Sequence, residues 1–212
     1  MKTLKLSIIG IVALLITSCE FIETNTHTYV DLGLSVNWAT CNIGAEYPEQ
    51  AGQYFAWGEV YAGDGDIEDY KWYESLDSEV SIISKYNPEV DNKTTLVTSD
   101  DVATMKWGYD WRMPTLSEME ELITKCTWNF TNKNGVPGYN VIGPNGNSIF
   151  LPAVGQKDNS QKGYVGHSGF YWTSSLYKGD CNKSYSLRFT SSDNYVTYVE
   201  RYIAQTVRAV RP

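Results

Sequence analysis

The chain has 212 residues, a formal net charge of −8 and many aromatic side chains, with 7 Trp, 16 Tyr and 6 Phe. This length suits one domain, and the negative charge argues against nucleic acid as a partner because phosphate backbones repel an acidic protein. The only histidines are His27 and His167, both in polar stretches, so a histidine-based metal site or nucleophile is poorly supported. We expect no cofactor and no metal.

The N-terminus has the pattern of a secretory signal. Lys2 and Lys5 give it a positive start, and the apolar run from Leu6 to Ile16 is shorter than the roughly 20 residues that span a bilayer. The run ends in the sequence Ile-Thr-Ser before Cys19. This ending resembles the lipobox of bacterial lipoproteins, in which the peptidase cuts before the cysteine and the cysteine sulfur is acylated.

The resemblance implies that residues 1–18 are a lipoprotein signal peptide and that residues 19–28 are a tether carrying a lipidated Cys19, for example with palmitate. An ordinary signal cut near Ser18 is the alternative. The acidic start Glu20-Phe-Ile-Glu is similar to surface-export signals of Bacteroidetes lipoproteins, although a solvated tether explains it equally well. We expect a protein anchored by lipid in the outer membrane, on the cell surface or the periplasmic face.

Residues 29–212 are expected to form the single domain. Tyr29 to Thr40 alternates apolar and polar residues around a glycine, which predicts two short strands or a hairpin. The aromatic run from Gly52 to Gly58 predicts another strand. Residues 62–92 carry many acidic side chains, and we interpret them as a long loop or insertion. Within it, Asp64 to Glu68 faintly resembles a calcium loop, but a solvated acidic loop is the default because two EF-hand features are missing.

Two helices are predicted next. The first begins at the N-cap Ser99, has an apolar side formed by Val102, Met105 and Trp107, and stops at Gly108. The second follows Pro114 and starts with a Thr-x-x-Glu capping box formed by Thr115 and Glu118. The apolar residues of the second helix recur at three- and four-residue spacings, which predicts one buried face; they are Leu116, Met119, Leu122 and Ile123.

The rest of the chain predicts strands. Asn145-Gly146 supplies a turn between two apolar strands in residues 139–151. Further strands are expected at Gly169–Ser174, Ser184–Phe189, Tyr195–Glu200 and Thr206–Val210. Because two helices come before a run of strands, the order indicates an α+β domain.

The three cysteines that remain after lipidation are Cys41, Cys126 and Cys181. Export permits disulfides, but an odd number leaves at least one thiol unpaired and the pairing cannot be read from sequence. Cys181 lies in a polar, loop-like stretch, so we slightly favour a Cys41–Cys126 bond.

Several motifs occur in one order along the chain: residues 29–45, 54–59, 111–115, 138–152, 171–175 and 207–210. Together they resemble the Fibrobacter succinogenes major paralogous domain of Bacteroidetes lipoproteins, over most of the mature chain. The resemblance implies a C-type-lectin-like fold, with two helices flanking a small twisted antiparallel sheet and with long loops. In such a fold the last strands carry the ligand-facing surface.

Two groups of conspicuous residues have competing interpretations. Arg112 could bind an anion, but we favour a structural arginine paired with Asp101 or with backbone carbonyls. Four tryptophans are expected in the core rather than on a ligand platform, because they lie in apolar or family-motif segments; they are Trp38, Trp57, Trp111 and Trp172.

The polar stretches 176–184 and 191–202 hold the candidate ligand-binding residues. Tyrosine and asparagine give flat contact area and adaptable hydrogen bonds at low entropic cost, although an ordinary polar surface explains the composition almost as well. The candidates are Tyr177, Lys178, Asp180, Asn182, Lys183, Asn194, Tyr195, Tyr198, Arg201 and Tyr202.

These features favour a lipid-anchored surface module that recognises a glycan or protein ligand and is not an enzyme. Calcium-dependent sugar binding of the usual C-type kind is disfavoured because its Glu-Pro-Asn and Trp-Asn-Asp triplets are absent from the sequence. A structural subunit of a surface assembly is an alternative. An enzyme related to formylglycine-generating proteins is less favoured, since that chemistry needs a cysteine pair and only Cys181 lies in the C-terminal region.

Overall fold

The computed structural model describes residues 27–75 and 81–212. The predicted signal peptide at residues 1–18 and the predicted lipidation residue Cys19 lie outside the described residues, as does most of the tether. In the described part of the chain, no helix combines the length and apolar character needed to cross a membrane.

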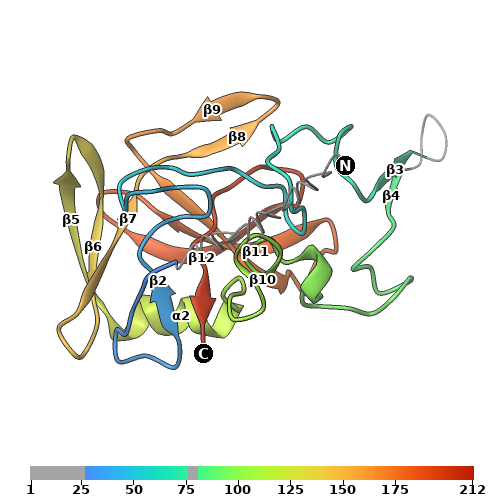
Figure 1. Ribbon diagram of the computed structural model, residues 1–212. Coiled ribbons are helices and arrows are strands. Elements are labelled where there is room, and N and C mark those ends of the chain that lie inside the picture. Colours follow the sequence, from blue (N-terminus) through green and yellow to red (C-terminus); the bar gives the residue numbers. More distant parts are fainter. Residues whose placement is uncertain (1–26, 76–80) are drawn as a thin grey trace, which may run out of the picture.

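The described residues form small antiparallel sheets, with few helices (Figure 1). The helical elements are the 3-10 turn η1 (Thr98–Asp100), α1 (Val102–Trp107) and α2 (Leu116–Lys125). The strands are β1 (Tyr29–Val30), β2 (Asn37–Ala39), β3 (Tyr73–Ser75), β4 (Ser81–Ile83), β5 (Thr127–Lys133), β6 (Val136–Ile142), β7 (Ser148–Pro152), β8 (Gln156–Asp158), β9 (Gln161–Gly163), β10 (Gly169–Leu176), β11 (Lys183–Phe189), β12 (Asn194–Glu200) and β13 (Val210–Arg211).

The strands are grouped as β1-β2-β13, β3-β4, β5-β6-β7, β8-β9 and β10-β11-β12. The sheet β10-β11-β12 lies in the middle of the domain and α2 packs against it, while β5-β6-β7 and the β3-β4 hairpin lie at opposite ends (Figure 1). Two core clusters hold the domain together. One is centred on Trp57 and Trp172, and the other includes Leu187 and Phe189.

The expected fold class, an α+β domain with two helices flanking one small sheet, is wrong. Strands dominate the described residues and belong to several separate sheets. Among the described helices, α2 packs against the β10-β11-β12 sheet, whereas α1 has six residues and buries Val102 and Ala103 in the first core cluster. The expectation failed because strands with both faces exposed carry no alternating pattern. β5, for example, exposes all but one of its seven side chains.

The first predicted helix begins later than expected. Asp101 is its N-cap, accepting hydrogen bonds from the backbone N–H groups of Ala103 and Thr104, whereas Ser99 lies in η1. The predicted apolar residue Met105 is 52% exposed. Asp101 outcompetes Ser99 because its second carboxylate oxygen also accepts the Met113 N–H, which ties α1 to the next segment.

The second predicted helix is confirmed. Thr115 accepts a hydrogen bond from the Glu118 N–H, and the Glu118 carboxylate accepts one from the Thr115 N–H, so both arms of the capping box form. Met119 and Leu122 are buried in the second core cluster, as the spacing predicted.

Most of the expected strands are present. The early pair is β1-β2, the hairpin with Gly146 at positive φ is β6-β7, and the later strands are β10, β11 and β12. The run Gly52–Gly58 is wrong as a strand, because within it only Phe55 makes an isolated bridge, to Gln205. The last strand is limited to Val210–Arg211.

The four tryptophans singled out in the sequence are confirmed as core residues, since none is more than 5% exposed. Arg112 is structural in this fold and contacts a backbone carbonyl as predicted, but its carboxylate partner is Glu118 rather than Asp101. It makes a two-pronged ion pair with Glu118, at 2.7 and 2.5 Å, and donates to the Met113 carbonyl oxygen. Arg112 therefore joins the start of α2 to the preceding segment.

The predicted Cys41–Cys126 bond is absent, because Cys41, Cys126 and Cys181 are all free thiols. The Cys41 thiol points to the Glu46 carbonyl oxygen at 3.5 Å, whereas Cys126 is the C-cap of α2 and packs against the second core cluster. The two side chains thus contact different parts of the domain and do not meet.

Candidate functional site

The β11-β12 hairpin decides where most of the candidate residues point. Side chains alternate between the two faces of a strand, and Tyr185 in β11 lies directly opposite Tyr198 in β12. Farther along the same face, Leu187 and Phe189 enter the second core cluster, which α2 helps to cover. Tyr185 and Tyr198 extend this face beyond the core cluster.

A stack of three tyrosines occupies this exposed end. The rings of Tyr177 and Tyr198 are parallel, with centroids 3.9 Å apart, and the Tyr185 ring meets Tyr177 edge-on at 5.3 Å. Tyr198 is 47% exposed. The neighbouring Tyr198 hydroxyl raises the pKa of Tyr177 above its ordinary value. We call Tyr177, Tyr185 and Tyr198 the tyrosine face.

Charged side chains border the tyrosine face. Lys183 is 5.8 Å from the centre of the Tyr198 ring and pairs with Glu200 at 3.5 Å and with Asp180 at 3.9 Å. Asp180 also accepts hydrogen bonds from the backbone and side chain of Asn182, at 2.9 Å each. The turn between β10 and β11 is therefore built from candidate residues that hold one another in place.

Tyr195 and Asn194 lie apart from this group. Tyr195 alternates to the opposite face from Tyr198 and stands across from Arg188, whose guanidinium carbon is 6.0 Å from its ring centre. Asn194 begins β12 at the far end of the strand. Lys178 is exposed on the turn after β10. The predicted patch is thus not one continuous surface.

Arg201 is not a surface residue, which corrects the prediction for this position. It is 1% exposed, and its guanidinium carbon lies within 4.7 to 5.6 Å of four aromatic ring centres. We call these rings the aromatic cage; they belong to Trp57, Tyr70, Trp72 and Tyr86. The Nη1 group of Arg201 donates to the carbonyl oxygens of Lys85 and Cys181.

A pocket of about 270 Å³ lies beside Arg201. One side is formed by the segment that the sequence suggested to be a loop, and the other by the end of β12 and the turn before β11. The lining residues are Ile67, Tyr70, Tyr73, Ile83, Asn182, Glu200, Arg201 and Tyr202. The Lys183–Glu200 ion pair connects this pocket to the tyrosine face.

The structure therefore brings together seven of the ten candidates, in two adjoining places. Tyr177, Asp180, Lys183 and Tyr198 belong to the tyrosine face and its border, and Asn182, Arg201 and Tyr202 line the pocket. Sequence reasoning missed Tyr185, although it had predicted the strand in which this residue lies. It also missed Tyr70, Tyr73 and Ile83, whose aromatic and β-branched composition was the available signal.

Other features of the described residues are less suited to a specific site. No group of three or more His, Cys, Asp or Glu side chains in residues 27–75 and 81–212 is arranged to hold a metal ion. Asp64, in the stretch that resembled a calcium loop, pairs with Lys157 at 2.6 Å. A larger, polar depression of about 650 Å³ lies beside His27 and Trp107 but includes none of the candidates.

No family model, no curated protein and no solved structure matches this chain.

Proposed function

We propose that this protein is a lipid-anchored binding module of the outer membrane that uses the tyrosine face to recognise a glycan or protein ligand without catalysing a reaction. The proposal includes membership of the major paralogous domain family that its motifs resemble. It also includes removal of residues 1–18 and lipidation of Cys19. A membrane is then the first partner, and the ligand of the tyrosine face is the second.

The tyrosine face is the observation that carries the proposal. Large aromatic rings on a surface expose apolar area to water, and contact with a ligand removes that area from water. Tyr177 and Tyr198 already hold each other in a parallel stack, so little side-chain entropy remains to be lost on binding. The face is therefore preorganised for contact.

The border of the face adds polar contacts. Lys183, Asp180 and Glu200 compensate one another's charges, and such a rim orients a ligand by hydrogen bonds more than it adds to affinity. An apolar centre with a polar rim is the usual anatomy of a recognition surface.

The proposal is tested by binding of the full-length protein to a glycan array and to an array of surface and extracellular proteins. Tyr198→Ala removes the outer ring of the stack, and Tyr195→Ala is the matched control because it removes a similarly exposed tyrosine from the opposite face. Loss of a well-packed aromatic contact of about 1.4 kcal/mol or more weakens binding at least tenfold.

We expect Tyr198→Ala to lose at least tenfold in affinity for the selected ligand, and Tyr195→Ala to stay within about twofold of the unsubstituted protein. The melting temperatures of both variants should lie within a few degrees of that of the unsubstituted protein, since the two side chains are partly exposed. A ligand that binds Tyr198→Ala with undiminished affinity would exclude the tyrosine face as its site. The array that yields the ligand distinguishes a glycan from a protein.

A further inference from the structure

The side edge of the buried Arg201 guanidinium makes no well-aligned hydrogen bond, although the nearby Tyr70 hydroxyl partly offsets the lowering of the Arg201 pKa by burial. Its Nε and Nη2 donors are buried and unpaired in the described structure. These two N–H groups lie on the same edge of the guanidinium and form the fork that binds a carboxylate through two parallel hydrogen bonds. The aromatic cage attracts the charge, but ring faces are only weak hydrogen-bond acceptors.

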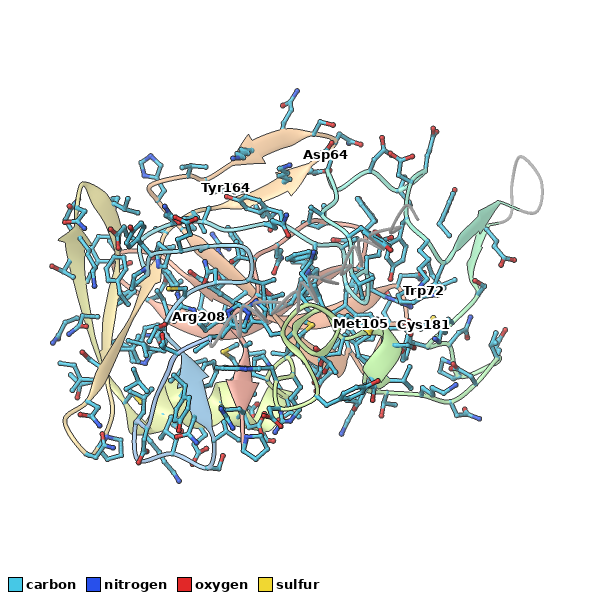
Figure 2. All side chains as sticks on the ribbon, viewed as in Figure 1. Asp64, Trp72, Met105, Tyr164, Cys181 and Arg208 are labelled. Atoms are coloured by element: carbon cyan, nitrogen blue, oxygen red, sulfur yellow. The ribbon has the colours of Figure 1, made fainter. Side chains whose placement is uncertain are left out.

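Arg208 shows how a structural buried arginine is satisfied in the same domain. It is also 1% exposed and lies in the interior (Figure 2). Its Nε donates to the Asn42 side chain, Nη1 donates to two carbonyl oxygens, and Nη2 donates to the Phe150 carbonyl oxygen. Every nitrogen of Arg208 has an acceptor, whereas two of the three in Arg201 have none.

The nearby carboxylates bind partners other than Arg201. Asp100 pairs with Lys71 and Lys85, Glu200 pairs with Lys183, and Glu59 accepts the Lys71 backbone N–H at 2.8 Å. Arg201 forms no ion pair in the described residues. A buried cation is costly unless it is paired, so the site favours a negatively charged partner.

The pocket beside Arg201 is suited to the body of such a partner. Its walls combine apolar and aromatic surfaces, including Ile67, Ile83 and Tyr73, and Asn182 supplies a polar group. A volume of about 270 Å³ is just below the range of roughly 300 to 1,000 Å³ for drug-sized ligands, which points to a smaller molecule. Trp72, from the cage, belongs to the first core cluster, Cys181 packs against that cluster, and both appear on the β3-β4 side of the domain (Figure 2).

We infer that this pocket binds a small organic carboxylate with an apolar body. The charge of Arg201 attracts the carboxylate, whose two oxygens accept hydrogen bonds from Nε and Nη2 once the side chains that cover these buried atoms shift aside. The body packs against Tyr73, Ile83 and Tyr202. Glu200 also lines the pocket and repels the ligand, although its pairing with Lys183 reduces this effect. The inference deepens the proposed function, on which it rests, because the pocket adjoins the tyrosine face.

Phenylacetate is a suitable probe, and phenylacetamide is its neutral counterpart of nearly the same shape. We would titrate each into the ¹⁵N-labelled full-length protein and follow the amide signals of Tyr73, Ile83 and Tyr202. We expect phenylacetate to shift these signals and to bind at least tenfold more tightly than phenylacetamide. No shift, or equal affinity for the two compounds, would overturn the inference.

Two substitutions test whether Arg201 attracts the carboxylate and whether Glu200 repels it. Arg201→Met should abolish phenylacetate binding, but it removes a buried residue and its fold must be checked from the dispersion of the amide signals. Glu200→Gln keeps the shape of a partly exposed residue and removes the repulsion, so it should tighten phenylacetate binding about twofold to fivefold and leave phenylacetamide unaffected. Weaker phenylacetate binding in Glu200→Gln would contradict the proposed orientation.

Failure of this inference can be separated from failure of the proposed function. Tyr198→Ala should keep phenylacetate binding, because its side chain does not line the pocket. If phenylacetate does not bind while the array ligand still depends on Tyr198, only the carboxylate pocket is refuted. If phenylacetate binds while the array ligand ignores Tyr198, only the tyrosine face is refuted.

Discussion

Asp100 connects the cage-bearing segment to η1, and its replacement should destabilise the domain. Asp100 is 3% exposed, and its carboxylate accepts a hydrogen bond of 2.6 Å from the Tyr86 hydroxyl and forms ion pairs with Lys85 and with Lys71. Tyr86 in turn accepts the Val97 N–H. Loss of the charge therefore weakens the contacts that place Tyr86 in the aromatic cage.

The size of the effect follows from these contacts. A hydrogen bond to a charged group contributes about 1.5–3 kcal/mol, but Lys71 and Lys85 are partly exposed and water weakens their share. In Asp100→Asn the amide oxygen still accepts one hydrogen bond. We expect the free energy of unfolding to fall by about 2 kcal/mol in Asp100→Asn and by about 3 kcal/mol in Asp100→Ala.

The pH dependence gives an independent check. Burial raises the pKa of Asp100, but hydrogen bonds from Lys85 and Tyr86 and the charge of Lys71 outweigh it, so the net pKa is below the ordinary value of 3.8. A carboxyl with a lowered folded-state pKa stabilises the fold above its unfolded-state pKa. That stabilisation is lost as the pH falls through the lower folded-state value.

Urea unfolding of the unsubstituted protein, Asp100→Asn and Asp110→Asn between about pH 7 and pH 2.5 measures this effect. Asp110 is the control because its pair with Arg211, at 3.7 Å, is highly exposed on the Asp110 side. The gap between the unsubstituted protein and Asp100→Asn should be constant near neutral pH and should shrink in acid. The reasoning is refuted if Asp100→Asn changes stability no more than Asp110→Asn, or if the gap is unchanged in acid.

Two further predictions concern a glycine and a cysteine. Gly143→Ala should destabilise the domain by about 2 kcal/mol or more, because the added Cβ would lie 2.0 Å from the Leu32 carbonyl oxygen. Gly163→Ala is the control: its Cβ would lie in open space, so the free energy of unfolding should change by less than about 0.5 kcal/mol. Similar urea midpoints for the two variants would contradict the packing at Gly143. Burial, with a smaller effect of Glu121, raises the pKa of Cys126 to about 11. Alkylation of Cys126 by iodoacetamide should therefore be slow at pH 8, and its rate should rise about tenfold for each added pH unit. Rapid labelling of Cys126 at pH 8, seen by peptide mass spectrometry, would contradict this burial.

Local signals in the sequence predicted local structure well. The capping box of α2 and the turn at Gly146 depend on neighbouring residues, and both form as expected. The strands β10, β11 and β12 were found because they are aromatic or alternate. By contrast, β5 is polar along almost its whole length, and its pairing with β6 depends on the partner strand rather than on its own pattern.

The site was only partly predictable for the same reason. Tyr177 and Tyr198 were identified by composition, but their stacking requires the turn before β11 to bring them together. Arginine is usually exposed, so the sequence placed Arg201 on the surface. Its burial results from rings such as Trp57 and Tyr70, which are more than a hundred residues away in the chain. Such contacts are set by tertiary packing alone.

Chemical-shift mapping of the ligand selected on the arrays tests the central claim most directly. Added to the ¹⁵N-labelled protein, the ligand should shift the amide signals of Tyr177, Lys183, Tyr185 and Tyr198 and leave those around Tyr195 in place. Shifts confined to the opposite face of β12, or to the depression beside His27, would show that recognition occurs elsewhere on the molecule.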